Sequence, residues 1–263
     1  VDALTDLGCA VETLNAQPDG SFPGRPSEPT AENCESLATL VRQSDATVGI
    51  AHDGDADRLR AVAGDGTYLS GDVTLALFAA DAATTGDRVA VPVDTSLAVK
   101  KYLAERGVGV ERTPVGDTYV AAAATAPDVA FGGEPSGAWI WPEKTLCPDG
   151  PYAACRLVAL ANERSLTERA SEIPTYPIEL GSVAVEAKTA VMERVRERLL
   201  ADYDESRVST LDGVRVETTD GWFLLRASGT QPLVRVTAEA HEKQRAAALF
   251  AEASEYVETA RER

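Results

Sequence analysis

The chain has 263 residues, 44% of them hydrophobic, which is enough apolar material for the cores of two domains or parts of three. Its 42 acidic and 25 basic side chains give a formal net charge of −17, a sign that repels nucleic-acid phosphates and anionic membrane surfaces. The sequence shows neither a long apolar run nor a secretion signal, so we expect a cytoplasmic protein without nucleic-acid or membrane partners. The four cysteines are scattered, which argues against zinc and disulfide sites, and the oligomeric state stays open.

The acidic excess has a second interpretation. Most of the basic residues are arginine, and carboxylates in excess keep a protein surface hydrated in concentrated salt. We therefore expect a halophilic protein, in which much of the acidic surface serves solvation.

The predicted elements of the first part surround an acidic loop. We expect the end of a helix, a strand over 9–15, a Pro/Gly-rich loop over 17–29, a helix over 31–43, and strands over 47–52 and 59–63. The acidic segment 53–58 lies between the last two strands, at a strand end where α/β sheets usually bind ligands.

Helices and strands alternate from residue 71 to about 164. The expected strands are 88–93, 109–113 and 128–132, with helices over 95–106 and 117–125. Such alternation predicts an α/β fold with a mixed, mostly parallel sheet and helices on both of its faces.

The order of elements changes after two prolines, Pro174 and Pro177. We expect a strand over 178–186, a helix over 189–203, strands over 214–218, 222–226 and 233–239, and a long helix from residue 241. The last part is therefore an α+β domain with an antiparallel sheet.

Alternating carboxylates form the first candidate site. Asp53, Asp55 and Asp57 can turn their oxygens to one centre, as a hard divalent cation requires. An EF-hand is excluded because the loop has Arg58 at its sixth position and Gly64 at its twelfth. A solvated acidic turn remains the alternative. If a metal binds, phosphate is the expected substrate group, because the ion and Arg58 offset the repulsion between anions.

The second and third candidates are loops next to strands. In the segment GGEPSG, Glu134 and Ser136 offer an acceptor and a donor for vicinal sugar hydroxyls. In the segment RASGTQP, Arg226 offers a fork that matches phosphate oxygens, while the residues that follow offer hydroxyl and N–H groups: Ser228, Gly229 and Thr230. Ordinary turns are the alternative for both loops.

Taken together, the loops DGDADR, GGEPSG and RASGTQP resemble the α-D-phosphohexomutases, the family of phosphoglucomutase, phosphomannomutase and phosphoglucosamine mutase. The segments PDGSFPGRPSEPT and TPVGDTYV resemble that family too, so the resemblance spans the whole chain. It implies that 1–68 is the end of the family's second domain, 69–174 the third and 175–263 the fourth, and its form is most similar to archaeal members.

The resemblance also implies the chemistry. Phosphate moves between C1 and C6 of a hexose or hexosamine through a bisphosphorylated sugar, and a phosphoserine of the first domain donates and recovers it. Mg²⁺ would bind Asp53, Asp55 and Asp57, and Arg58 would meet the substrate. Glu134 and Ser136 would hold sugar hydroxyls. The distal phosphate would be bound by four residues, which are Arg226, Ser228, Gly229 and Thr230.

Two departures from the family pattern limit this expectation. The serine loop is not in these residues, so we expect that the chain alone does not turn over and has no catalytic nucleophile. Ala138 stands where bacterial relatives often have histidine, so the general acid or base stays unassigned. Two alternatives remain open: a non-catalytic sugar-phosphate binder, and a phosphatase with Asp53 as nucleophile.

Overall fold

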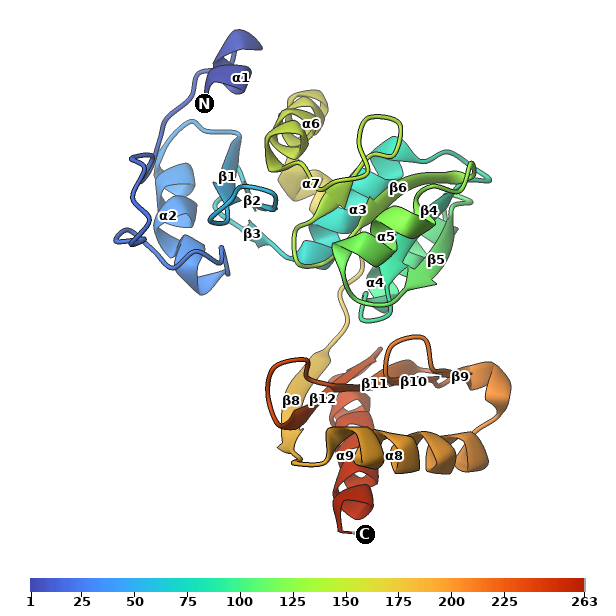
Figure 1. The fold of residues 1–263 in the computed structure, drawn as a ribbon. Coiled ribbons are helices and arrows are strands. Elements are labelled where there is room, and N and C mark those ends of the chain that lie inside the picture. Colours follow the sequence, from blue (N-terminus) through green and yellow to red (C-terminus); the bar gives the residue numbers. More distant parts are fainter. Residues whose placement is uncertain (263) are drawn as a thin grey trace. The chain divides into compact units, whose positions relative to one another are not determined.

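The computed structural model describes residues 1–262, and its contacts divide the chain into two compact units. The first comprises Val1–Arg112 and Gly116–Pro174, and the second comprises Thr113–Val115 with the described residues from Thr175 onward (Figure 1). Of the two domain boundaries predicted above, the one at residue 174 coincides with the boundary between these units. The division into three domains remains a prediction. Among residues 1–262, none of the helices combines the length and apolar composition that crossing a bilayer requires.

The first unit begins with a small antiparallel sheet. Its elements are α1 (Asp2–Asp6), η1 (Glu32–Cys34), α2 (Glu35–Gln43), β1 (Val48–His52), β2 (Leu59–Ala63) and β3 (Tyr68–Leu69). The strand order is β1-β2-β3, and both pairings are antiparallel. Leu37 and Val41 of α2 approach Gly49 of β1 so closely that only a small residue fits there. The acidic loop therefore connects two antiparallel strands. It does not lie at the carboxyl end of a parallel sheet, where α/β proteins usually bind ligands.

One predicted strand in this region is wrong. Residues 9–15 form no strand, although their apolar residues suggested one, and most of their side chains are exposed. A strand is stable only when a neighbour satisfies its N–H and C=O groups, and no described sheet pairs with this segment.

A second sheet follows in the same unit. Its elements are α3 (Gly71–Ala82), β4 (Arg88–Pro92), α4 (Leu97–Ala104), β5 (Gly109–Thr113), α5 (Asp117–Ala123), β6 (Val129–Gly133), β7 (Trp139–Ile140), α6 (Gly150–Glu163) and α7 (Leu166–Ser171). The strand order is β5-β4-β6-β7, with β4 parallel to β6 and β7 antiparallel to it.

The two faces of the second sheet are covered by different helices (Figure 1). Gly132 of β6 faces Val120 of α5, whereas its neighbour Gly133 faces Leu75 of α3. Successive strand residues point to opposite faces, so α5 and α3 lie on opposite sides of the sheet. This confirms the mixed α/β fold class.

Aromatic side chains fill the core beside the second sheet. Trp139 is fully buried and Trp141 is 3% exposed. Phe78 packs edge-on against both, with ring centroids 5.5 and 5.1 Å away. The two tryptophans therefore serve packing of the core.

The second unit is an antiparallel sheet with two helices. Its elements are β8 (Ile178–Ala184), α8 (Lys188–Asp202), η2 (Glu205–Arg207), β9 (Val208–Ser209), β10 (Val214–Glu217), β11 (Gly221–Ala227), β12 (Leu233–Ala240) and α9 (Lys243–Arg261). The strand order is β8-β12-β11-β10-β9. Phe223, Leu225 and Val236 of the sheet form one core with Val195 of α8 and Leu249 of α9. This is the α+β arrangement expected from the sequence.

Candidate functional site

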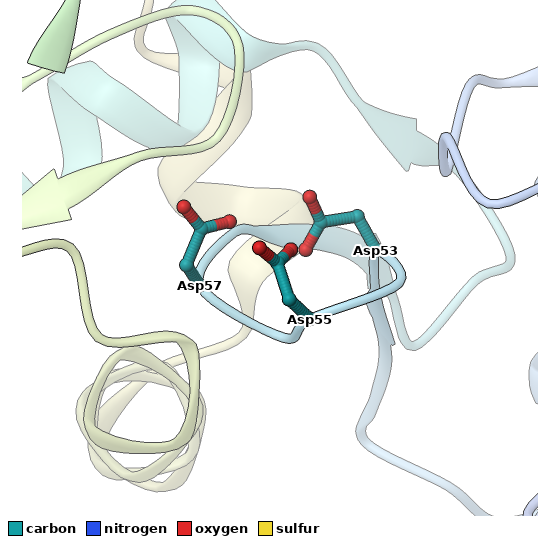
Figure 2. A group of neighbouring side chains, drawn as sticks. All are labelled: Asp53, Asp55 and Asp57. Carbon is teal, nitrogen blue, oxygen red and sulfur yellow. The ribbon is translucent and has the colours of Figure 1, made fainter. Parts of the chain in front are cut away.

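The acidic loop brings its three aspartates together. A carboxylate oxygen from each of Asp53, Asp55 and Asp57 lies within 4.8 Å of the others, and Figure 2 shows the three carboxyl groups pointing toward one another. The loop reverses direction at Ala56, whose φ of 59° is in the left-handed region. The alternation of the sequence and this reversal together place the three side chains on one side of the loop.

The three carboxylates differ in burial and partners. Asp53 is 9% exposed, and Arg58 donates to it from its backbone N at 3.2 Å and from Nε at 2.6 Å. Burial raises the pKa of Asp57, and repulsion from Asp53 and Asp55 raises it further, against a smaller opposing effect of Arg58. The arrangement concentrates negative charge around the carboxylate of Asp57.

These residues fit a hard divalent cation. The Oδ1 atom of Asp57 is buried and makes no hydrogen bond within residues 1–262, and Arg58 Nε is 3.7 Å away from it. A buried carboxylate oxygen without a hydrogen bond is costly, and a cation bound by several oxygens would remove this cost. The donor set, carboxylates only, suits Mg²⁺ or Mn²⁺.

A second loop, which sequence reasoning left without a role, supports the metal loop. Arg25 donates through NH1 to the carbonyls of Pro26 and Ser27, at 2.8 Å each, and through NH2 to the carbonyl of His52. His52 lies with Nδ1 2.9 Å from the carbonyl of Arg58, so the ring donates across the base of the loop. The histidine therefore has a structural role in this loop.

Arg58 is held between carboxylates. Besides its bonds to Asp53, its NH1 lies 2.8 Å from Oε2 of Glu28. Its side chain is 29% exposed, so part of the guanidinium remains accessible. The expected contact between Arg58 and substrate stays a prediction.

The predicted sugar loop follows β6. Glu134 is 8% exposed, and its Oε1 accepts a hydrogen bond from Gly116 N at 2.7 Å. Its Oε2 accepts one from Ser136 Oγ at 3.2 Å. Burial raises the pKa of Glu134 despite these two bonds, and the negative charges of Asp94 and Asp117 add to the rise. Glu134 and Ser136 therefore form one hydrogen-bonded pair, anchored to Gly116.

Within the first unit, the sugar loop is joined to the strand that leaves the metal loop. Leu59 N donates to Gly137 O at 3.0 Å, and Trp139 Nε1 donates to Leu59 O at 3.2 Å. Arg58 and Ala138 form an antiparallel bridge. The structure thus brings the metal loop and the sugar loop together, although about 80 residues separate them in sequence.

The predicted phosphate loop connects β11 to β12 in the second unit. Ser228 is 5% exposed, its N donates to Leu233 O at 3.0 Å, and its Oγ accepts from Gln231 N at 3.2 Å. Arg226 NH1 lies 3.5 Å from Oδ2 of Asp212. The loop is a tight turn that begins near Arg226, and its role in binding phosphate stays a prediction.

The tip of this loop offers free donors. Gly229 and Thr230 are exposed, and within residues 1–262 their N–H groups have no protein partner. A Cβ atom on Gly229 would meet nothing within 4 Å. Two unpaired N–H groups at an open turn suit a phosphate oxygen.

Sequence profiles of three domains of one family match the chain in order. They are described as phosphoglucomutase/phosphomannomutase alpha/beta/alpha domain II at residues 1–66, alpha/beta/alpha domain III at 70–176 and the C-terminal domain at 182–255. The chain belongs to the phosphoglucomutase/phosphomannomutase family. This confirms the resemblance that the three loops indicated.

Curated relatives within the phosphoglucomutase/phosphomannomutase family carry a more specific name. A probable phosphoglucosamine mutase of Methanopyrus kandleri is 47% identical over 249 residues, which are 92% of this chain and 55% of that protein. One of Methanosarcina acetivorans is 46% identical over 243 residues, 91% of this chain and 55% of that protein. The chain therefore spans little more than half the length of these relatives.

Solved structures of the phosphoglucomutase/phosphomannomutase family share the fold. A family protein of Burkholderia thailandensis is 27% identical, with a TM-score of 0.85, over 97% of this chain and 56% of that one. Aspergillus fumigatus N-acetylphosphoglucosamine mutase, in complex with GlcNAc-6P and magnesium, is 18% identical with a TM-score of 0.59. The match covers 87% of this chain and 54% of that one, and it shows a likeness of fold alone.

Proposed function

We propose that this chain is the metal-binding and sugar-phosphate-binding part of a phosphohexomutase, an isomerase that interconverts hexosamine or hexose 1-phosphate and 6-phosphate through a bisphosphorylated sugar. The names of similar curated relatives favour glucosamine phosphate as the substrate. The observation that carries the proposal is the joining of the aspartate cluster and the Glu134–Ser136 pair through Leu59. A cation site and a hydroxyl-binding pair, fixed to each other, suit a phosphorylated sugar. The cytoplasmic location stays a prediction.

The residues have distinct proposed roles. Asp53, Asp55 and Asp57 would hold Mg²⁺, which supplies charge neutralisation at a phosphoryl group when bound. Arg58 would add a positive charge beside it, and Glu134 with Ser136 would orient the sugar through its hydroxyls. The distal phosphate would be gripped in the second unit by Arg226, Ser228, Gly229 and Thr230.

A phosphatase with Asp53 as nucleophile gains no support from this geometry. Both carboxylate oxygens of Asp53 accept hydrogen bonds from Arg58, and the side chain is 2% exposed. A nucleophile must be accessible to a phosphorus atom, and the neighbouring exposed Asp55 is more accessible than Asp53.

Activity with the family's serine-bearing segment supplied tests the proposal. The gene region that encodes this chain, together with the sequence upstream of Val1, is expressed and assayed with glucosamine 6-phosphate and Mg²⁺. We expect mutase activity that falls at least about 100-fold in Asp55→Ala, because removing one charged ligand weakens the metal site and its charge neutralisation. Asp65→Asn, at the exposed turn that joins β2 to β3, is the matched control and should retain activity.

Two results would contradict the proposal. A fully active Asp55→Ala enzyme would refute the metal role of the cluster. Submillimolar binding of a hexose phosphate, together with no mutase activity once the upstream segment is present, would favour the non-catalytic binder.

A further inference from the structure

A lysine outside the three loops is bonded to the phosphate loop. Lys188 is the first residue of α8 and is half-buried. Its ammonium group donates to two backbone carbonyls, those of Ser228 and Gln231, the second at 2.9 Å. These two carbonyls bracket Gly229 and Thr230, whose N–H groups are unpaired.

The position of Lys188 is unfavourable for the helix that it begins. A cation in the first turn of a helix opposes the helix dipole and is therefore unfavourable there. The residue before it, Ala187, offers no side-chain cap. Local helix preferences therefore do not explain a lysine here, whereas the two loop carbonyls do.

The charge of Lys188 is not neutralised by a neighbouring acid. Within residues 1–262 no carboxylate forms an ion pair with it, although the protein has 42 acidic residues. The ammonium group thus contributes a full positive charge beside a loop that already has Arg226 at its start. Both charges favour an anion at the turn.

Some backbone groups of the phosphate loop are hydrogen-bonded, and others have no partner within residues 1–262. The N–H groups of Ser228 and Gln231 are used within the loop, and the carbonyls of the same two residues accept from Lys188. The backbone is therefore fixed on both sides of Gly229 and Thr230. Their two N–H groups remain as the donors that the turn offers.

We propose that Lys188 is a positioning residue for the phosphate loop: it fixes the backbone between Ser228 and Gln231 and places a positive charge beside the turn that receives the phosphate dianion. The inference rests on the proposed function of this loop. It adds a residue that lies about 40 positions away in sequence and is part of no recognised motif.

Calorimetric titration of inorganic phosphate and of glucosamine 6-phosphate into the 263-residue chain tests the inference. Lys188→Met keeps the apolar stem but removes both hydrogen bonds and the charge, and we expect it to raise the Kd for both ligands about tenfold, which corresponds to about 1.4 kcal/mol of binding free energy. Lys188→Arg keeps the charge and two donors and should restore affinity to within about threefold. Lys243→Met, which removes an exposed lysine at the first position of α9, is the matched control and should change Kd less than twofold.

The outcomes separate this inference from the proposed function. If Arg226→Ala abolishes phosphate binding and Lys188→Met leaves Kd unchanged while only lowering the melting temperature, Lys188 is merely structural and the inference is wrong. Failure of the unaltered chain to bind either ligand would instead refute the phosphate role of the loop.

A measurement on the unaltered chain covers the case in which Lys188→Met does not fold. We expect the amide signals of Gly229 and Thr230 to show the largest chemical-shift changes in the second unit when phosphate is added, and Lys188→Arg to preserve this pattern. Unchanged signals at both positions of the unaltered chain under saturating phosphate would refute the phosphate role of the loop, whereas loss of this pattern in Lys188→Arg would overturn the inference.

Discussion

Ala56 has the most constrained backbone in the metal loop. A residue with a Cβ atom at φ 59° is strained relative to glycine, yet this reversal is what places the carboxylates of Asp55 and Asp57 on the same side. The sequence predicted the cluster because its residues are neighbours in the chain. It gave no sign of the strain, since alanine is common in every kind of element.

The stability of variants at position 56 should depend on how well the new residue tolerates this positive φ. We expect Ala56→Val to lower the free energy of unfolding by about 1–2 kcal/mol, because β-branched residues tolerate a positive φ least. Ala56→Gly should change it by no more than about 1 kcal/mol, because relief of strain offsets the greater freedom of the unfolded chain. Urea denaturation measures both variants.

The control for these substitutions is Ala10→Val. Ala10 is exposed and does not have a positive φ, so the change should stay within about 0.5 kcal/mol. An Ala56→Val protein as stable as this control would show that the loop relaxes freely and is not held in the described conformation.

At the scale of elements, the start of β2 joins the metal loop to the sugar loop, a contact that the sequence did not predict. The pairing of Leu59 with Gly137 leaves no local signal, because Leu59 begins β2 whereas Gly137 lies far along the chain in the loop after β6. The same is true of the bond from Gly116 to Glu134. Motifs within one loop were therefore predictable, whereas the contacts that bring loops together were not.

Two secondary-structure predictions failed because the outcome depended on neighbouring residues and not on the segment alone. Helix α6 was not among the predicted helices, although Asp149 accepts from Tyr152 N as an N-cap and proline is favoured at the first helical positions. The strand predicted over 9–15 had apolar residues but no partner strand. Local preference describes a segment only where its neighbours agree with it.

Gly137→Ala tests the junction between the loops. Gly137 has φ +108°, and a Cβ atom there would lie 2.8 Å from the carbonyl oxygen of Leu59. We expect a loss of about 1–3 kcal/mol of stability and weaker binding of glucosamine 6-phosphate. Thermal melting and calorimetry measure the two effects.

Gly86→Ala is the matched control for this substitution. Gly86 has φ +99°, but a Cβ atom there meets nothing within 4 Å, so backbone strain is present without the collision. Equal effects of the two substitutions on ligand binding would contradict a specific role for the Leu59–Gly137 contact.

Two tyrosine hydroxyls donate hydrogen bonds between α8 and α9, so we expect the protein to lose stability at alkaline pH. Tyr256 donates to Oδ2 of Asp202 at 2.8 Å, and burial together with this bond raises the pKa of Tyr256 to about 12. The unfolded phenol ionises near pH 10, so the stabilisation is complete below that pH and is lost as the pH rises from about 10 to 12. Burial and a bond to Glu252 raise the pKa of Tyr203 as well.

Tyr256→Phe should make this alkaline loss of stability less steep, as measured by urea denaturation between pH 9 and 12. Tyr119→Phe, which alters a tyrosine that is 53% exposed, is the control and should leave the pH dependence unchanged. A Tyr256→Phe protein with the slope of the unaltered chain would contradict the pairing of the helices through this phenol.

At the scale of the whole chain, a charge of −17 predicts a strong response to salt. Like charges destabilise the compact state at low ionic strength, and screening relieves that repulsion. We expect the melting temperature to rise as KCl increases from 0.1 to 3 M, most of the rise lying beyond the range where simple screening saturates. A melting temperature independent of salt would contradict the halophilic interpretation.

The composition and the three loops thus predicted the family, the fold class and the candidate residues, because each depends on residues that are close in sequence. The contacts that bring the metal loop and the sugar loop together left no such local signal. The aspartate cluster beside the sugar loop lies within one unit, and a metal ion at this cluster is the central expectation.

Anomalous X-ray diffraction from crystals of the chain grown with Mn²⁺ tests this site most directly. We predict one strong anomalous peak within about 2.5 Å of a carboxylate oxygen of each of Asp53, Asp55 and Asp57, lost in Asp55→Asn crystals grown in the same way. Strong Mn²⁺ peaks elsewhere, with none at the three aspartates, would contradict the account.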